Sequence, residues 1–319
     1  SIQTPILIHT QHSFVHLGKR ERYKLYERLF TFFADGVVTV SEPIEDTYLK
    51  LGVPRRKLFG VRNGVLYPAF ESRTDVSISN ARCELASTHA SHVHDSSVWD
   101  AQHWIVYVAR IYPGKGQEHA IQIWNSLPER LRKNAALFFV GPCRSQSELA
   151  ELQSRASAAH DGNRIMFLGA SSVPERWYRA ATVCLSCSEF EGHPLVPIEA
   201  IGNGSPFLAS GILGHRFLAQ FAVLFDGGSQ SSAVSALTAI LERASQCPQY
   251  VAAECDKKAR CFRDRFSFQR TLAQYEVLYN RFLSFELKGE NTEEMRVPLG
   301  GSWRVEFPNR WALDTRTRS

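Results

Sequence analysis

Residues 188–200 read Ser-Glu-Phe-Glu-Gly-His-Pro-Leu-Val-Pro-Ile-Glu-Ala. This stretch follows an apolar run typical of a buried strand, passes through a glycine loop and enters a predicted helix with Pro194 in its first turn, a preferred position for proline. The start of such a helix offers free backbone N–H groups and a partial positive charge, which suit a phosphate or a developing anion. Glu191 lies in the loop and Glu199 on the helix, with seven residues between them. The two carboxylates could accept hydrogen bonds from hydroxyl groups on both sides of a diphosphate, although each alone could equally be a capping or surface carboxylate.

Around this stretch, short apolar runs alternate with longer amphipathic segments. From residue 104 onward the runs predict six strands, at residues 104–109, 137–141, 165–169, 183–186, 206–209 and 222–225. Between them lie four candidate helices, at residues 117–126, 148–159, 174–180 and 194–203. This alternation is typical of a parallel, doubly wound α/β sheet. We therefore expect residues 104–266 to form one complete domain.

Upstream, the same alternation is cut short. We expect strands at residues 5–9, 36–40 and 58–61, and helices at residues 19–33 and 44–51. A sheet of this class usually has five strands or more. Residues 1–70 are therefore interpreted as a partial N-terminal Rossmann-like domain. Two explanations stay open: further strands precede this sequence, or a partner chain supplies them.

Residues 71–103 are polar, show no periodicity and contain four histidines, His89, His92, His94 and His103. No cysteine or carboxylate pattern accompanies them, so a solvated linker or insertion is favoured over a zinc site. After residue 225 we expect helices at about residues 232–245 and 248–262. A longer helix at residues 267–285 should return toward the first domain, and residues 286–319 are interpreted as a tail.

A second candidate anion site is Val108-Ala-Arg-Ile-Tyr-Pro-Gly-Lys-Gly, at the end of the first strand of the second domain. Arg110 and Lys115 flank a Pro-Gly turn. Both cations could converge on one anion at the carboxyl edge of the sheet, where doubly wound folds bind ligands. Taken alone, the same residues would also fit an ordinary solvated strand end.

The composition is that of a soluble globular protein, with 44% hydrophobic and 22% charged residues. No apolar run approaches the roughly 18 residues that a spanning helix needs. The net charge of +5 is spread out, without the basic run that would indicate nucleic acid. Seven scattered cysteines, an odd number, indicate a reduced, cytoplasmic setting. Cys184 and Cys187 have C-x-x-C spacing but lie in a predicted strand with no second pair, which favours core packing over zinc binding.

Taken together, these segments resemble the retaining nucleotide-sugar glycosyltransferases of family 4, the group 1 enzymes with the GT-B fold. The resemblance extends over residues 5–285. Besides the segments quoted above, it rests on short motifs in this order: Val40-Ser-Glu, Arg62-Asn-Gly-Val, Val140-Gly, Phe167-Leu-Gly, Trp177-Tyr-Arg-Ala-Ala, Gly204-Ser-Pro and Arg265-Phe-Ser. The implied fold is α/β, of GT-B type, with two doubly wound Rossmann-like domains facing a cleft and the N-terminal one incomplete.

The resemblance implies a retaining hexosyltransferase, which moves a sugar from a nucleotide-diphosphate sugar to an acceptor hydroxyl. Arg110 and Lys115 would hold the diphosphate, Glu199 the ribose, and Glu191 the transferred sugar. Backbone groups around the helix start would supplement them, at Gly192, His193, Pro194 and Leu195. The chain at residues 167–169, including Gly169, would meet the base. In Thr10-Gln-His-Ser, His12 would lie beside the anomeric carbon and act in catalysis with Arg110, Lys115 and Glu191, although an ordinary loop histidine would also fit.

Three features depart from the family pattern. Its glycine-rich loop after the first strand is not in this chain, Leu66 stands where the pattern has Asp, and residues 213–217 (Leu-Gly-His-Arg-Phe) lack the Glu of Gly-Gly-x-x-Glu. The donor half is complete and the acceptor half truncated, so activity of this chain alone stays open. Two alternatives therefore remain, a non-catalytic sugar-nucleotide-binding subunit completed by a partner chain, and a sugar-nucleotide epimerase of the same fold.

No metal or other cofactor is expected, because basic side chains and a helix start would carry the positive charge that a metal otherwise supplies. The expected partners are a nucleotide sugar and a glycan, lipid-linked or small-molecule acceptor. Family members often work at a membrane face, and the predicted helix at residues 19–33 mixes basic residues with aromatics, as interfacial helices do. A peripheral membrane contact and a core helix with a solvated basic edge both stay open.

Overall fold

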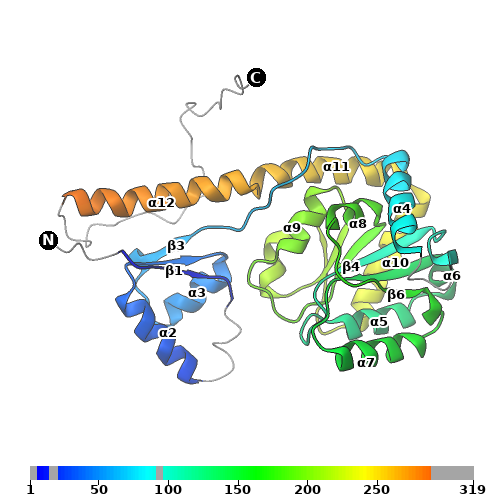
Figure 1. The fold of residues 1–319 in the computed structure, drawn as a ribbon, viewed down its shortest axis with the longest axis horizontal. Helices are drawn as coiled ribbons and strands as arrows, with labels where there is room; N and C mark the ends of the chain where they lie inside the picture. Colours follow the sequence, from blue (N-terminus) through cyan, green and yellow to red (C-terminus); the bar gives the residue numbers. More distant parts are fainter. Residues whose placement is uncertain (1–5, 14–20, 91–95, 289–319) are drawn as a thin grey trace, which may run out of the picture.

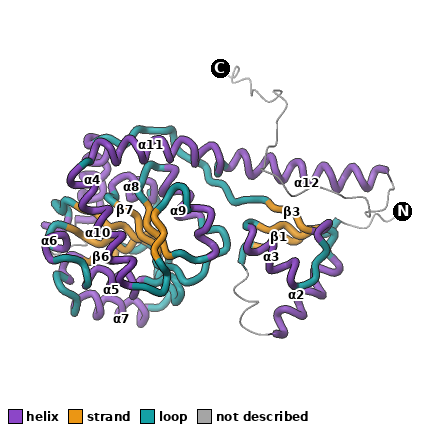
Figure 2. The backbone as a smooth tube through the Cα atoms, turned by 180° about the vertical axis from the view of Figure 1, so that it is seen from behind, coloured by secondary structure: helices purple, strands orange, loops and turns teal. Residues whose placement is uncertain are grey.

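The computed structural model describes residues 6–13, 21–90 and 96–288 of the 319-residue chain. Figure 1 shows a small N-terminal unit, in blue, and a larger unit, in cyan to yellow, with the long orange helix α12 (Phe268–Lys288) reaching back over the small one. Seen from behind in Figure 2, the strands of each unit have helices packed around them. Among the described residues, no helix is both long enough and apolar enough to cross a bilayer.

The larger unit is built on six parallel strands. They are β4 (His103–Val108), β5 (Ala135–Val140), β6 (Ile165–Phe167), β7 (Val183–Ser186), β8 (Phe207–Ser210) and β9 (Val223–Phe225). Across the sheet they lie in the order β6-β5-β4-β7-β8-β9, which is 3-2-1-4-5-6 when counted within the unit, as in Rossmann folds. β5 is buried at every position. A central parallel strand is covered on both faces, which explains its uniformly apolar sequence.

Helices cover both faces of this sheet. One face carries α5 (Gln117–Asn125), α7 (Gln146–Ser157) and α10 (Gln230–Gln246), with the short α6 (Glu129–Arg132) nearby. The other carries α8 (Pro174–Ala180), α9 (Leu195–Gly202) and α11 (Pro248–Arg265). Short 3-10 turns complete the unit at η3 (Ser96–Val98), η4 (Gly162–Arg164) and η5 (Leu213–Leu218). The predicted α/β, doubly wound class is confirmed.

The small unit has three parallel strands in the order β1 (Ile8–Gln11), β2 (Gly36–Thr39) and β3 (Leu58–Gly60). Its helices are α2 (Glu21–Phe33) and α3 (Glu42–Lys50), with the turn η1 (Arg55–Lys57) before β3. Successive residues of β2 point to opposite faces. Val37 packs with Ile44 of α3, whereas Val38 packs with Leu278 and Phe282 of α12.

The segment expected to be an aperiodic linker contains a helix, α4 (Asp75–His89), so the prediction of a solvated segment is wrong there. Ala81 and Leu85 of α4 belong to the core of the larger unit. Two arginines attach the segment to the carboxyl end of α8: Arg73 donates to the carbonyl oxygens of residues 179 and 181, and Arg82 to that of residue 180. Cations are favoured at a helix carboxyl end, where the last carbonyls have no partner within the helix. His92 and His94 lie outside the described residues.

The chain crosses between the two units at two places that lie side by side. The N–H of Val65 donates to the carbonyl of Phe266 at 3.0 Å, and the N–H of Phe268 donates back to Val65 at 2.9 Å. A Cβ on Gly64 would stand 2.3 Å from the carbonyl oxygen of Ser267, so the segments approach too closely for any side chain there. Helices α11 and α12 meet at this same point.

Candidate functional site

Strands β4 and β7 are neighbours in the middle of the sheet, and the strands that follow them lie on opposite sides. At such a switch point the loops at the carboxyl ends of the two strands diverge and leave a crevice in which ligands bind. The loop after β4 carries Arg110 and Lys115, and the loop after β7 carries Glu191. The topology therefore brings two motifs that are distant in sequence to one edge of the sheet.

The hydroxyl of Tyr107, on β4, ties the two loops together. It accepts a hydrogen bond of 2.7 Å from the N–H of Cys187 and donates one to the carbonyl oxygen of Lys115. Burial raises the pKa of the Tyr107 hydroxyl well above its usual value, so the group remains a donor. Gly116 allows the two loops to approach closely. It has φ +76°, and a Cβ there would lie 2.1 Å from the carbonyl oxygen of Cys187.

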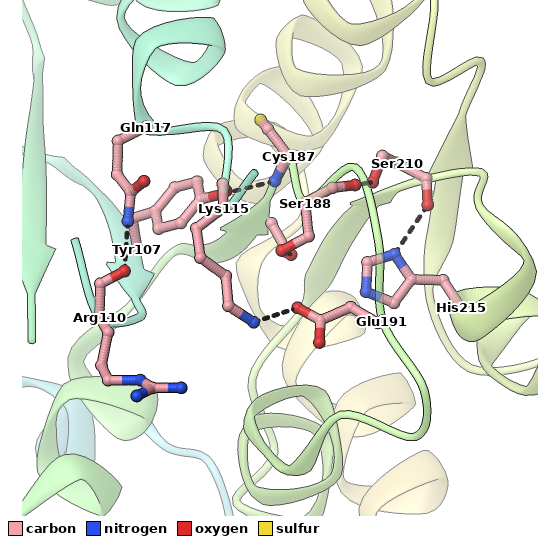
Figure 3. Close-up of polar contacts among 10 residues, drawn as sticks. Tyr107, Arg110, Lys115, Gln117, Cys187, Ser188, Glu191, Ser210 and His215 are labelled. Atoms are coloured by element: carbon pink, nitrogen blue, oxygen red, sulfur yellow. Dashed lines mark hydrogen bonds and ion pairs between the residues drawn. The ribbon is translucent and has the colours of Figure 1, made fainter. Parts of the chain in front are cut away.

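Lys115 and Glu191 form an ion pair between the two loops. The ammonium nitrogen of Lys115 lies 2.6 Å from Oε1 of Glu191 (Figure 3), and the exposed fractions of the two side chains are 26% and 14%. Arg110 is exposed at the start of the same loop, where its carbonyl accepts a 2.8 Å hydrogen bond from Gln117. Figure 3 shows its guanidinium apart from the ion pair. The structure thus joins two of the predicted site residues, Lys115 and Glu191, directly, and places Arg110 on the same loop as Lys115 but out of contact with the pair.

The turn η5 lies behind Glu191. A Cβ on Gly214 would stand 2.2 Å from the carbonyl oxygen of Glu191, so η5 and the Glu191 loop are in backbone contact. His215 is fully buried, and its Nδ1 lies 2.8 Å from the carbonyl oxygen of Ser210. The hydroxyl of Ser210 in turn donates to the carbonyl of Ser188 at 2.6 Å. The turn η5 and Ser210 therefore fix the position of the backbone that carries Glu191.

Glu199 is held from the neighbouring helix. Its Oε2 accepts a 2.6 Å hydrogen bond from the hydroxyl of Tyr178 on α8. Burial, and secondly the charge of Glu199, raise the pKa of the Tyr178 hydroxyl well above its usual value. A carboxylate has about four acceptor positions, so one bond from a tyrosine leaves capacity for ligand hydroxyls.

The loop before α9 presents backbone donors. Gly192, His193 and Leu195 each have an N–H, whereas Pro194 has none. The ring of His193 is buried and stacks on Phe217 at a centroid distance of 4.4 Å. Burial, and secondly the charge of Arg62, lower its pKa to about 3. Only the backbone of His193 is therefore suited to a ligand.

The small unit reaches the same loop through His12. A Cβ on Gly192 would stand 2.1 Å from the carbonyl oxygen of His12, and the side chain of His12 is exposed. A second contact between the units is the 2.9 Å hydrogen bond from the side-chain amide of Asn63 to the carbonyl of His193. His12 thus lies at the rim of the Glu191 loop, on the opposite unit.

Gly169 lies beyond the end of β6. It has φ +70°, and its carbonyl accepts a 2.7 Å hydrogen bond from the N–H of Gly141. A Cβ on Gly169 would meet no atom within 4 Å, so there is open space beside this loop. Open space at this carboxyl edge of the sheet is compatible with a planar base.

A cavity of about 350 Å³ lies on another side of the basic loop, against α5 and α7. Gly114, Glu118 and Arg155 are among its lining residues, but Lys115, Glu191 and Glu199 are not. The switch point is therefore the better candidate, because topology and charge coincide there.

The described residues contain no group of three His, Cys, Asp or Glu side chains that could hold a metal ion. Cys184 and Cys187 are buried free thiols, and the sulfur of Cys184 lies 3.2 Å from the hydroxyl of Ser205. Core packing of this pair, as predicted, is confirmed.

Sequence reasoning missed Tyr107, Tyr178 and His215. Each acts from a strand, helix or turn whose residues follow an ordinary core pattern, and only the strand order and the packing of the helices bring them to the site. Residues 213–217 did carry a signal, since they depart from the family pattern, but the departure was interpreted only as the loss of a glutamate.

Residues 94–256 of the chain match the family Glycosyl transferases group 1. The chain belongs to this family. The lipopolysaccharide core biosynthesis mannosyltransferase LpsB of Rhizobium meliloti is 26% identical over 142 residues, which are 42% of this chain and 38% of that protein. The chain thus matches well under half the length of this curated relative. Family membership favours a glycosyltransferase over the alternative of a non-catalytic subunit.

Solved structures share the fold. Anabaena HepE in complex with UDP and glucose aligns with a TM-score of 0.71 at 18% identity, covering 88% of this chain and 72% of that one. Sucrose-phosphate synthase from Thermosynechococcus elongatus aligns with a TM-score of 0.64 at 21% identity, covering 87% and 68%. These similarities confirm the GT-B fold with two Rossmann-like units.

Proposed function

We propose that this protein transfers a hexosyl group from a nucleotide-diphosphate sugar to an acceptor hydroxyl, with retention of the anomeric configuration. The observation that carries the proposal is the Lys115–Glu191 pair, which places a cation and a carboxylate together at a helix start. A nucleotide sugar needs both, a cation for the diphosphate and an acceptor for sugar hydroxyls. HepE, a structural neighbour, was solved with UDP-glucose.

In this mechanism the acceptor oxygen bonds to the anomeric carbon while the bond from that carbon to the diphosphate oxygen breaks. The acceptor proton passes to the departing oxygen on the same face of the sugar, which retains the configuration. The protein contributes position and charge. Lys115, Arg110 and the N–H groups before α9 stabilise the leaving diphosphate, so the proposal requires no metal.

The remaining residues each bind a different part of the nucleotide sugar. Glu191 accepts hydrogen bonds from the transferred sugar, Glu199 from the ribose, and the chain at Gly169 contacts the base. His12 contacts the sugar from the opposite unit, next to the anomeric carbon. The acceptor, a glycan, a lipid-linked glycan or a small molecule, enters from the side of the small unit.

Thermal unfolding with UDP and GDP tests the donor site. At a concentration 100 times the dissociation constant, the bound nucleotide should stabilise the protein by about 2.7 kcal/mol. No stabilisation by either nucleotide at millimolar concentration would contradict the assignment. Retention is tested separately, by the anomeric configuration of the first product formed with a donor that binds.

A peripheral membrane contact through α2 is a second proposal. The observation behind it is an apolar face exposed to solvent, formed by Leu25, Tyr26, Leu29, Phe32 and Phe33. Lys24, Arg28 and Lys50 line a hollow of about 300 Å³ beside it. Apolar and basic residues combined in this way suit an anionic bilayer surface.

Sedimentation with anionic liposomes tests the membrane contact, and binding is expected at low salt and weaker binding at high salt. Leu29→Glu should reduce it, whereas Val76→Glu, at an exposed apolar position on α4, should not. Absence of binding at low salt would contradict the membrane contact.

A further inference from the structure

His215 is a buried group that the proposed mechanism does not use. Its side chain is 0% exposed. Nδ1 lies 2.8 Å from the carbonyl oxygen of Ser210, and because a carbonyl can only accept, Nδ1 carries the hydrogen. In the neutral ring Nε2 is then an acceptor, and among the described residues it has no hydrogen-bond partner.

The charged groups that face His215 are Glu191, from the loop after β7, and Lys115, from the loop after β4. Figure 3 shows the ring edge that carries Nε2 on the side of Glu191. Burial is the largest influence and lowers the pKa of His215, while the Ser210 carbonyl and Glu191 raise it and Lys115 lowers it. The ring is therefore neutral while Lys115 is bound to Glu191.

A bound diphosphate would make the surroundings of His215 more negative. It attracts Lys115, and Glu191, which is 14% exposed, then loses its counter-ion. An uncompensated carboxylate in a largely buried position is unfavourable. When Lys115 moves away from Glu191, a cation near His215 is lost and the negative charge of Glu191 is no longer neutralised. Both changes favour the protonated form of the His215 imidazole. Figure 3 shows the Nε2 edge of His215 facing Glu191, so movement of the carboxylate toward that edge would let His215 replace Lys115 as its partner.

We propose that His215 is a positioning residue of the donor site, which takes up one proton at Nε2 when a nucleoside diphosphate engages Lys115 and then donates a hydrogen bond to Glu191. Glu191 thereby stays ionised and directed at the transferred sugar. Solvent supplies the proton and receives it again when the nucleotide leaves. This inference rests on the donor site of the proposed function and adds a link between donor binding and protonation.

Calorimetric titration with UDP, in buffers that differ in ionisation enthalpy, measures the proton uptake. Between pH 6 and pH 8 the wild-type protein should take up as much as one proton per UDP more than His215→Gln. The amide of that variant can donate to Glu191 without titrating, and the proton change of UDP itself is common to both proteins. His160→Gln, which changes an exposed histidine after the end of α7, should keep the wild-type uptake.

The affinity gives a second readout. Because the pKa of His215 is higher in the bound state, the wild-type dissociation constant for UDP-glucose should rise with pH, by at most about tenfold per pH unit. The dissociation constant of His215→Gln lacks this contribution and should therefore change less with pH than that of the wild type. His215→Leu provides no donor for Glu191 and should lower turnover more than His215→Gln does.

The outcomes separate this inference from the function on which it rests. No binding of UDP or GDP by the wild-type protein contradicts the donor site itself. Binding with equal proton uptake in wild type and His215→Gln overturns the role of His215 alone. If the variant fails to fold, the pH dependence of UDP-glucose binding to the wild-type protein tests the inference alone. The diphosphate of UDP-glucose has no group that titrates near neutrality, so any pH dependence comes from the protein. An affinity for UDP-glucose that is constant from pH 6 to pH 8 also overturns the inference.

Discussion

The ammonium group of Lys115 donates a hydrogen bond of 2.6 Å to the carboxylate of Glu191, across the switch point of the larger sheet. We assign the first residue to the diphosphate and the second to the transferred sugar. Without a ligand, the two groups therefore satisfy each other, which avoids leaving either charge unpaired in a largely buried position. A donor has to exchange this pair for two contacts of its own.

Substitution of the two carboxylates should have different effects. Glu191→Gln releases Lys115 and should leave binding of a nucleoside diphosphate unchanged or tighter, while turnover falls because a sugar contact felt near the transition state is weakened. Glu199→Ala should weaken nucleoside diphosphate and donor together, by roughly tenfold to a hundredfold, since a hydrogen bond to a charged group contributes about 1.5–3 kcal/mol. Calorimetry and initial rates measure the two effects. Loss of diphosphate binding in the Glu191 variant, with normal binding in the Glu199 variant, would reverse the assigned roles.

Tyr107→Phe should weaken the link between the two loops. The substitution leaves the N–H of Cys187 and the carbonyl of Lys115 without their buried partner, which should lower the free energy of unfolding by about 1–3 kcal/mol. Because the loop that carries Lys115 is no longer fixed, the dissociation constant for UDP should also rise. Tyr112→Phe, at an exposed tyrosine of the same loop, is the control and should change neither quantity. Unchanged stability and affinity in Tyr107→Phe would show that the hydroxyl does not order the loops.

Arg82→Met should destabilise the larger unit by about 2–3 kcal/mol. The guanidinium donates to the carbonyl of Ala180 at 3.0 Å and to the hydroxyl of Thr182 at 3.1 Å, and it stacks on Trp104. Removal of this group leaves buried acceptors without a donor. Urea unfolding measures the loss. Arg155→Met removes an arginine from exposed ion pairs and should cost less than about 1 kcal/mol. Equal effects of the two substitutions would mean that α4 is only loosely attached.

Acidification should destabilise the protein through two buried histidines. Burial lowers the pKa of His103 to about 4 and that of His193 to about 3, below the usual value near 6.5. As pH falls below 6.5, the unfolded chain binds protons that the folded chain excludes, so the free energy of unfolding decreases, by up to about 1.4 kcal/mol per pH unit for each residue.

His193→Phe isolates the contribution of His193 to this pH dependence. The substitution preserves stacking on Phe217 and removes two ring nitrogens that lack a hydrogen-bond partner among the described residues. The variant should be more stable than the wild type, and its stability should fall less steeply between pH 6.5 and pH 4.5. Chemical unfolding at several pH values provides the measurement. A slope identical to that of the wild type would contradict the buried, neutral state of His193.

Much of the larger sheet could be predicted because its strands are short apolar runs that end at polar loops. β7 was predicted at the residues where it occurs, and β4 and β5 within two residues. The predicted start of β1 was three residues too early. The strand itself, Ile-His-Thr-Gln, contains three polar residues and therefore lacks the apolar run that made the buried strand β2 easy to recognise. α4 was missed altogether. Besides Leu85, its attachment depends on arginines and the small Ala81, which leave too few large apolar residues for a clear periodicity.

The candidate site followed from the sequence to the extent that it lies at loop motifs. Lys115 and Glu191 were expected to bind one ligand, and their direct contact is compatible with that expectation. The support provided by Tyr178 and His215 could not be predicted, because it depends on the relative placement of α8, α9 and η5. For α2 the sequence left a membrane contact and a core helix both open, since an amphipathic pattern does not reveal whether anything covers its apolar side.

The pairing of Val65 with Ser267 has a mechanical consequence. If the two units turn relative to each other, the two chain crossings bound side by side are the point about which they would turn. α12 starts at the pivot and is anchored on the small unit by Leu278 and Phe282, so it moves with that unit as a lever arm. A helix of 21 residues is about 32 Å long. A turn of about 10° at the pivot would therefore displace its far end by roughly 6 Å. A displacement of that size is comparable to the width of a sugar ring.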